Sequence, residues 1–304
     1  MAPRRWLMPA ARTEPRGNTD VIVRIVGFFA GLAFVSALLV AFVMPREAAV
    51  VTATHEFHRE PKEISFSFDN PVWGKFDRQQ LQRGFQVYKE VCSACHAMKL
   101  VAFRDLEQIG FTKPEVKAIA KQWSTEVPSI NDKTGEPTTR KAIPSDYFPS
   151  PFANETAARA GNNNALPPDL SDIAKAREGG AHYIHSLLSG YTEQAGYKNE
   201  DGKELLKEFP DAKTPPGLHF NPYFANLNIA MPPPLAAEGQ VTYADGTKAT
   251  IDQMSTDVSA FLMWAAEPKL ENRHRTGIAV FLFLLIATML AYGSYQTIWR
   301  DKKH

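Results

Sequence analysis

The chain has 304 residues and a net charge of +1, but residues 46–273 hold 25 Lys and Arg against 30 Asp and Glu, a net charge of −5. An acidic surface argues against a nucleic-acid partner; it would attract a basic protein, or simply keep the domain soluble. The only two cysteines lie within four positions, and no second Cys or His pair follows at a ligand spacing. This excludes a structural zinc site with four such ligands.

The first predicted element is an apolar segment at residues 25–43, preceded by five arginines in residues 1–24. Its 19 uncharged residues could cross a bilayer core of about 30 Å as a helix. A cleaved signal peptide normally has an apolar core of about 7 to 15 residues and a small-residue cleavage site soon after it. The only tolerable site lies at residues 51–53, well beyond the segment. A retained signal anchor is therefore favoured over a cleaved signal peptide.

The stretch VYKEVCSACHAMKL, residues 87–100, contains Cys92, Cys95 and His96. A thioredoxin-like dithiol should follow a strand, whereas the residues before Cys92 have helical apolar spacing. Cys-x-x-Cys-His is the pattern of covalent haem attachment, in which two thiols bond the porphyrin and the imidazole reaches the iron. We therefore predict one covalently bound haem c at the C-terminal end of a helix, with both thiols on the apolar face.

Further helices are expected from caps and apolar periodicity. Thr112 with Glu115 forms a capping-box pattern that predicts a helix start. Thr250 predicts the start of a last soluble helix, which should end before Pro268. Two short helices are expected at residues 169–177 and 180–191.

The remaining segments are predicted to be strand or loop. Residues 241–249 suggest a small hairpin that turns at Asp245-Gly246. Residues 124–152 and 192–222 are polar, have no apolar period, and are predicted to be surface loops that wrap a cofactor or form a partner surface, unless they are mobile insertions.

A haem iron also needs a second axial ligand, a nitrogen or a thioether sulfur from a distant part of the chain. Met231 lies in NIAMPPPL, where three prolines stiffen the backbone and could hold its sulfur against iron. A core methionine beside a proline run is an ordinary alternative. Met98 is too close to His96 to reach the opposite haem face. The other candidates fit a helix core or a surface position instead: Met254, Met263, His182, His185 and His219.

A second apolar segment, residues 277–298, is uncharged and long enough to span a bilayer, with aromatic residues near its far end. A buried core helix is the alternative. Basic residues flank it on both sides, so charge alone leaves its orientation open. Haem is attached on the oxidising periplasmic side in bacteria. Residues 44–274 are therefore expected in the periplasm, and residues 1–24 and the tail 299–304 in the cytoplasm.

The chain carries four motifs in order: GFQVYKEVCSACHAMKLVAFRDL, ALPPDLSDIAKAREGGAHYIHSLLSGY, HFNPYFANLNIAMPPPL and DVSAFLMWAAEP. With the C-terminal apolar segment, they closely resemble the cytochrome c1 family of the quinol-cytochrome c reductase, the bc1 complex. The resemblance runs from about Phe76 to the C-terminus. It implies a class I c-type cytochrome domain with a C-terminal transmembrane anchor, whereas an uncleaved N-terminal helix is not the usual arrangement in the family. With the apolar segment at residues 25–43, the expected fold is a mainly α, class I c-type cytochrome domain with long loops, flanked by an N-terminal and a C-terminal transmembrane helix. Cys92 and Cys95 would form the thioether links, and His96 and Met231 would be the axial ligands.

The resemblance also implies, position by position, which residues surround the haem. Arg177 and Tyr183 match the family's contacts to the haem propionates, which need charged or hydrogen-bonding partners. Asn164 stands where the family often has Gly, but Asn tolerates a left-handed backbone, so the turn should survive. Pro232 replaces a usual Ala and should stiffen the proline-rich segment that carries Met231, residues 231–234, which we call the strap. The expected pocket lining is Asn162, Ala165, Pro168, Leu188, Phe224 and Ile229.

The activity implied by the resemblance is electron transfer as a subunit of the proton-translocating quinol-cytochrome c oxidoreductase of a respiratory or photosynthetic chain. The chain itself would be an electron carrier without catalytic residues, in the bacterial inner membrane. Its expected partners are cytochrome b, the Rieske iron-sulfur protein, a soluble or anchored cytochrome c acceptor and the membrane, in a dimeric complex. Two alternatives are a free-standing membrane-anchored c-type cytochrome that serves a terminal oxidase, and a non-catalytic assembly or docking subunit.

Overall fold

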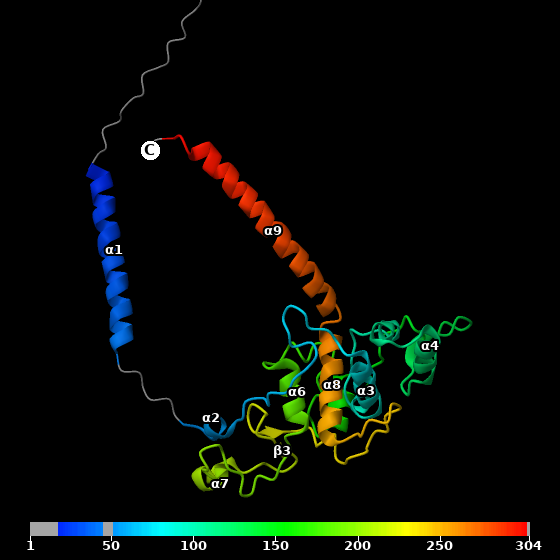
Figure 1. The fold of residues 1–304 in the computed structure, drawn as a ribbon. Helices are drawn as coiled ribbons and strands as arrows, with labels where there is room; N and C mark the ends of the chain where they lie inside the picture. The colour runs from blue at the N-terminus through cyan, green and yellow to red at the C-terminus, as the bar shows by residue number, and fades with distance from the viewer. Residues whose placement is uncertain (1–17, 45–50, 303–304) are drawn as a thin grey trace, which may run out of the picture. The chain divides into compact units, whose positions relative to one another are not determined.

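The structure is a computed structural model that describes residues 18–44 and 51–302 (Figure 1). The chain divides into two compact units, Met1–Val51 and Thr52–His304. In the described part, helices dominate and the strands form two small antiparallel sheets. The prediction of a mainly α chain is therefore confirmed.

The elements are assigned as follows. The first unit contains the described helix α1 (Asn18–Val43). The second unit contains, in chain order, α2 (Ala53–Phe57), α3 (Arg78–Glu90), the 3₁₀ helices η1 (Cys92–Ala94) and η2 (Phe103–Ile109), α4 (Lys113–Gln122), β1 (Val127–Ile130), β2 (Pro137–Arg140), α5 (Glu155–Gly161), α6 (Gly180–Leu188), α7 (Leu205–Glu208), η3 (Pro210–Ala212), β3 (His219–Phe220), β4 (Asn228–Ile229), α8 (Ile251–Ala266) and α9 (Leu270–Trp299). Strand β1 pairs with β2 and strand β3 with β4, both antiparallel.

Among the residues that the structure describes, two helices are long and apolar enough to cross a membrane. The mean hydropathy reaches 2.5 in Val21–Val43 of α1 and 2.1 in Leu270–Trp299 of α9, and the apolar side chains of both are exposed. Each helix starts earlier than the sequence predicted, because a polar segment continues the same helix before the apolar one. The predicted cytoplasmic segments, residues 1–24 and 299–304, and the predicted periplasmic domain, residues 44–274, each fall partly outside the described residues.

The core of the second unit is centred on α3 and α8, which pack against each other (Figure 1). On α3, Leu81, Phe85 and Tyr88 are at most 3% exposed, as their helical spacing predicted. Phe261 of α8 packs its ring 5.7 Å from those of both Phe85 and Tyr88. Gly84 of α3 lies so close to α8 that a Cβ atom there would overlap the backbone of Asp257. This close approach fixes the end of α3 from which the cysteines follow.

Both predicted helix caps are confirmed. The Glu115 carboxylate accepts the Thr112 N–H at 2.7 Å at the start of α4. At the start of α8, the Thr250 hydroxyl accepts the Gln253 N–H at 3.0 Å. Helix α8 ends at Ala266, before Pro268, as expected. These caps use only residues within one turn, which explains why the sequence alone identified them.

The predicted helix at residues 169–177 is wrong, because the segment forms consecutive turns. The Asp169 carboxylate accepts the N–H groups of Lys99 and Ser171, at 3.0 and 2.9 Å. The Leu170 N–H donates to the Ala97 carbonyl at 2.8 Å. Two of these bonds hold the start of the segment against residues 97–99. The backbone bonds that follow run mostly from i to i−3, as in turns, such as Ile173 to Leu170 and Lys175 to Asp172. The following helix, α6, is present as predicted, although it ends at Leu188 rather than near Tyr191.

The prediction of a hairpin at residues 241–249 is wrong, because the turn is present but the two strands are not. The turn exists, with Gly246 at φ +77° and the Thr247 N–H bonded to Asp245 Oδ1, but no strand flanks it. Asp245 instead pairs with Arg83 at 2.8 Å, which ties the segment to α3.

The two predicted surface loops contain regular structure as well. Residues 124–152 include the β1–β2 hairpin, and residues 192–222 include α7 and the buried Leu205.

Asn164 has the expected left-handed backbone, with φ +63°. Its N–H donates to the Arg159 carbonyl at 2.9 Å and closes the turn after α5. We expect Asn164→Ala to lower the free energy of unfolding by about 1 kcal/mol, because a Cβ-bearing residue without a local polar side chain is strained there. Asn164→Gly should cost nothing or add stability. Thermal unfolding of both variants tests this, and equal losses would contradict it.

Candidate functional site

The two cysteines lie on a tight turn that directly follows α3. The N–H groups of Cys95 and His96 both donate to the Cys92 carbonyl, at 3.1 and 2.9 Å. This turn brings two thiols and an imidazole together on five consecutive residues. Both cysteines are free.

The two thiols differ in environment. Cys92 is partly buried and packs against the main core, and burial, reinforced by the neighbouring Cys95, raises the pKa of its thiol to about 12. Cys95 is exposed. The prediction that both thiols lie on the apolar face is therefore wrong for Cys95, because α3 ends at Glu90 and its apolar stripe does not extend that far.

The ring of His96 is oriented by a residue far away in the sequence. Its Nδ1 lies 2.8 Å from the Pro168 carbonyl oxygen, which can only accept, so Nδ1–H is the donor. Burial lowers the pKa of His96 and favours the neutral imidazole. The neutral ring thus keeps its Nε2 lone pair for a metal, as in sites where a carbonyl fixes the second nitrogen of a ligating histidine.

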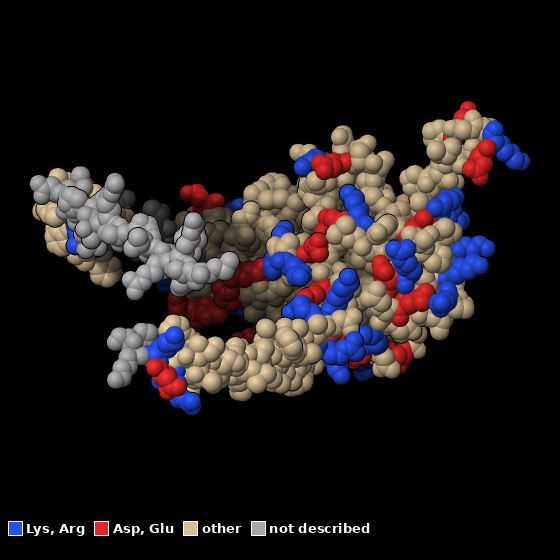
Figure 2. Space-filling model, turned by 90° about the horizontal axis from the view of Figure 1, so that it is seen from above, with Lys and Arg blue, Asp and Glu red and all other residues tan. Residues whose placement is uncertain are grey.

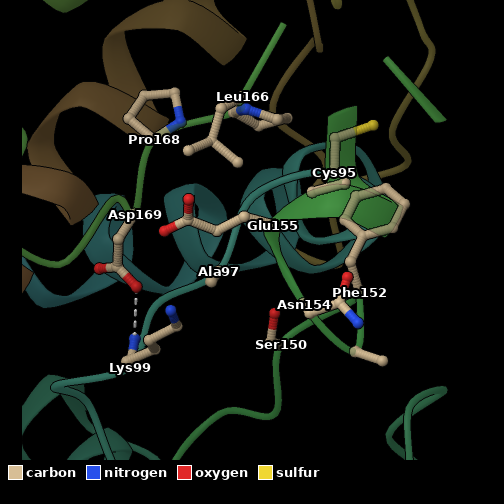
Figure 3. Close-up of a pocket in the computed structure, with 13 residues that line it drawn as sticks. Cys95, Ala97, Lys99, Ser150, Phe152, Asn154, Glu155, Leu166, Pro168 and Asp169 are labelled. Atoms are coloured by element: carbon tan, nitrogen blue, oxygen red, sulfur yellow. Dashed lines mark hydrogen bonds between the residues drawn. The ribbon is translucent and has the colours of Figure 1, made fainter. Parts of the chain in front are cut away.

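A cavity of about 510 Å³ opens beside this turn (Figure 3). Figure 3 shows Leu166 and Pro168 on one wall, with Lys99 and Ser150 across the cavity from them. Two predicted site residues, Cys95 and Pro168, line it. The complete lining is Cys95, Ala97, Lys99, Ser150, Phe152, Ala153, Asn154, Glu155, Ala158, Leu166, Pro167, Pro168 and Asp169.

Met231 is held through its backbone. The Tyr191 hydroxyl, just beyond α6, donates to the Met231 carbonyl at 3.0 Å. Burial raises the pKa of Tyr191, so its hydroxyl keeps its proton and remains a hydrogen-bond donor at any physiological pH. Met231 is partly exposed, and the prolines that follow it have no N–H to anchor the strap. Tyr191 was missed at the sequence level, because nothing in the sequence relates it to a residue 40 positions away.

The other predicted pocket residues lie in two places. Asn162 caps α5, where its side-chain amide donates to the Ala158 carbonyl at 2.7 Å, and the Ala165 N–H donates to the Asn162 carbonyl. Tyr183 and Leu188 are partly buried on α6. Burial raises the pKa of Tyr183, and the positive charge of Arg177 opposes this rise.

Two more predicted pocket residues, Phe224 and Ile229, lie in a segment that is bonded to α6, the helix that carries Tyr183 and Leu188. Ile229 is 8% exposed on β4 and Phe224 is partly buried. The side chain of Asn221 donates to the Leu187 carbonyl at 2.8 Å and links this segment to the end of α6. No hydrogen bond among the described residues joins His96 directly to the Met231 strap, so the axial pairing stays a prediction.

The donor groups fit a haem better than a bare metal ion. Within residues 18–44 and 51–302, no group of three or more His, Cys, Asp or Glu side chains could hold an ion. Instead, two free thiols adjoin an imidazole whose Nδ1 is occupied and whose Nε2 is available. A porphyrin supplies four ligands to its iron and needs only axial donors from the protein. The residues present therefore suit covalent haem c.

Comparison with known proteins gives a consistent result. The sequence model of the Cytochrome C1 family matches residues 66–302. The chain is 47% identical over 240 residues to cytochrome c1 of Rhodospirillum rubrum, which covers 77% of this chain and 85% of that protein. It is 41% identical over 293 residues to cytochrome c1 of Blastochloris viridis, and the alignment covers 90% of this chain and 97% of that protein. The cytochrome b-c1 complex catalytic subunit of Candida albicans is 37% identical over 283 residues, 91% of each chain.

Proposed function

The chain belongs to the cytochrome c1 family, and on this premise we propose that it relays single electrons from a Rieske iron-sulfur protein to a cytochrome c. One observation carries the proposal: the turn that presents both free thiols also presents His96 with its Nδ1 bonded to Pro168 and its Nε2 available. Such a turn suits a covalently attached redox group.

The cofactor would be one haem c, which supplies a one-electron iron couple when bound. The role of the chain is attachment, ligation and exclusion of water. Cys92 and Cys95 would form the covalent links, and His96 and Met231 would be the axial ligands. Arg177 and Tyr183 would contact the haem propionates. The pocket would be lined by Asn162, Ala165, Pro168, Leu188, Phe224 and Ile229.

We further propose the membrane arrangement. Residues 44–274 would form the periplasmic domain, with residues 25–43 and 277–298 as anchors and both termini in the cytoplasm of a bacterium. The apolar lengths of α1 and α9 support two spans. Attachment of haem c on the periplasmic side supports the orientation.

The proposed partners are cytochrome b and the Rieske protein in a dimeric, quinol-oxidising complex, and a cytochrome c as acceptor. The name of the Candida albicans relative, a subunit of the cytochrome b-c1 complex, supports membership in such a complex. Purification in a mild detergent tests the proposal. Stoichiometric cytochrome b and Rieske protein are expected to copurify. A lone chain, or copurification with a terminal oxidase, would contradict the proposal and favour a free-standing carrier.

Tyr191→Phe should loosen the strap that carries Met231, because the variant loses the 3.0 Å bond to the Met231 carbonyl and little else. A hydrogen bond of this kind contributes about 1 kcal/mol. We expect the reduction potential to fall modestly, and the pH at which the methionine ligand is displaced in the ferric protein to fall as well. Tyr147→Phe is the control, since Tyr147 is exposed and its hydroxyl has no assigned bond among the described residues. Equal effects of the two variants would contradict this role.

The acidic domain should steer a basic cytochrome c. Raising the salt concentration from about 10 mM to about 150 mM shortens the screening length from roughly 30 Å to about 8 Å. We expect the bimolecular rate of cytochrome c reduction to fall about ten-fold or more over this range. Stopped-flow kinetics measures it, with a small uncharged oxidant as the control. A flat profile would leave the net charge of −5 as a solubilising surface only.

A further inference from the structure

A short loop, residues 67–75, presents two apolar side chains to the outside. Asn70 Oδ1 accepts the N–H groups of Val72 and Trp73, at 2.9 and 2.8 Å, and the Gly74 N–H donates to the Asn70 carbonyl at 2.9 Å. A Cβ at Gly74 would overlap the backbone of Phe68. The tip of the loop is therefore a closed turn with one backbone path.

The exposure of this tip contrasts with its surroundings. Phe66, Phe68 and Phe76, on either side of the tip, are 4 to 7% exposed and form part of the main core. Trp73 is 68% exposed and Val72 42%. A rigid turn that buries its base but exposes a tryptophan and a valine side by side suits an apolar environment outside the chain.

The loop is tied to the first turn of α9. The Glu271 carboxylate accepts the Phe76 N–H at 2.9 Å and pairs with both terminal nitrogens of Arg78 at 3.0 Å. His274 Nδ1 lies 3.3 Å from the Gly74 carbonyl, the residue next to Trp73. These contacts fix the loop beside residues 271–274.

The same residues mark the polar end of the apolar span. Arg275 is the last charged residue of α9, and residues 276–299 are uncharged. Figure 2 shows charged side chains at both ends of α9 and uncharged side chains along its length. Gly277 follows His274 by three residues, or about 4.5 Å along a helix. The loop thus lies within about one helical turn of the boundary where α9 becomes apolar.

We propose that Val72 and Trp73 insert into the lipid interface of the bilayer that α9 spans, as a second membrane contact of the haem domain. Tryptophan is enriched at this depth because its ring is apolar and its N–H is polar. Lys75, Lys269 and Arg275 are exposed nearby and suit the phosphate groups of the lipid. The contact would hold the domain at a fixed distance from the membrane. This inference rests on the proposed membrane span of α9.

Photo-crosslinking tests the contact in the intact complex. The complex would be reconstituted in lipid nanodiscs that contain a phospholipid with a diazirine near its acyl carbonyl, irradiated, and mapped by mass spectrometry. We expect lipid adducts on α9 and on the peptide that contains Val72 and Trp73. Ile130 on β1 is the matched control, since it is 66% exposed and lies in the β1–β2 hairpin, outside both the loop and α9. Its peptide should carry several-fold fewer adducts.

A variant with Val72→Ser and Trp73→Ser should lose most adducts at the loop and keep those on α9. Both side chains are exposed, so the fold should be unaffected. Adducts on α9 without adducts on the loop would overturn the inference. Equal labelling of the Ile130 peptide would overturn it too. Absence of adducts on α9 itself would instead overturn the proposed membrane span.

Discussion

Replacing Met231 with histidine should leave the haem attached while its reduction potential falls. In the proposed site, the haem would be attached through the thiols of Cys92 and Cys95, which the substitution does not touch. A thioether favours ferrous iron relative to a harder nitrogen ligand, and axial ligands tune haem potentials over roughly 0.8 V. We expect a fall on the order of 0.2 V within that range. Electron transfer from the Rieske centre should then stall, because the reduction potential of the haem would be too low for it to accept the electron.

Potentiometric titration measures the shift, and the optical spectrum gives a second readout. The weak red absorption typical of ferric iron bound to a thioether should disappear in Met231→His. Met98→Leu is the control, because Met98 is fully buried in the core and the swap nearly conserves its volume. Loss of the absorption in Met98→Leu or in His219→Ala, together with its survival in Met231→His, would show that the ligand assignment is wrong.

Gly84→Ala should destabilise the haem domain severely. A Cβ at this position would overlap the Asp257 carbonyl oxygen and lie 2.7 Å from Phe261 Cβ, both on α8. Neither atom can move without separating α3 from α8, so the substitution acts as overpacking of a rigid contact. We expect a loss of about 3 kcal/mol or more in the free energy of unfolding. Because the cysteines follow α3 directly, the yield of haem-loaded protein should fall as well.

Urea unfolding monitored by circular dichroism tests this, with haem content per chain as the second measurement. Gln79→Ala is the control on the same helix, because Gln79 is exposed and is not part of the buried core. The control should change stability by less than about 0.5 kcal/mol. A Gly84→Ala protein as stable as the control would mean that α3 and α8 are not in close contact.

Site features formed by neighbouring residues could be predicted from the sequence, whereas those that join distant residues could not. The turn at Cys92, Cys95 and His96 was identifiable because its chemistry is contiguous. The orientation of the His96 ring was not, because it depends on a carbonyl 72 residues later. Likewise, Pro168 was expected only as pocket lining, yet its carbonyl positions the imidazole. The pairing of His96 with Met231 remains a prediction to be tested by the variants above.

Features that depend on local chemistry and on segment length could be predicted from the amino-acid order alone. The haem attachment motif, the caps at Thr112 and Thr250, and the two apolar spans each depend on residues within a few turns. Tertiary structure decided where a polar side chain had a choice of partner. Asp169 bonds the backbone at Lys99 and Asp245 pairs with Arg83, so a predicted helix became turns and a predicted hairpin became a tether to α3. A local hydrogen bond is worth little net in water, so a distant partner that folding brings close can replace it.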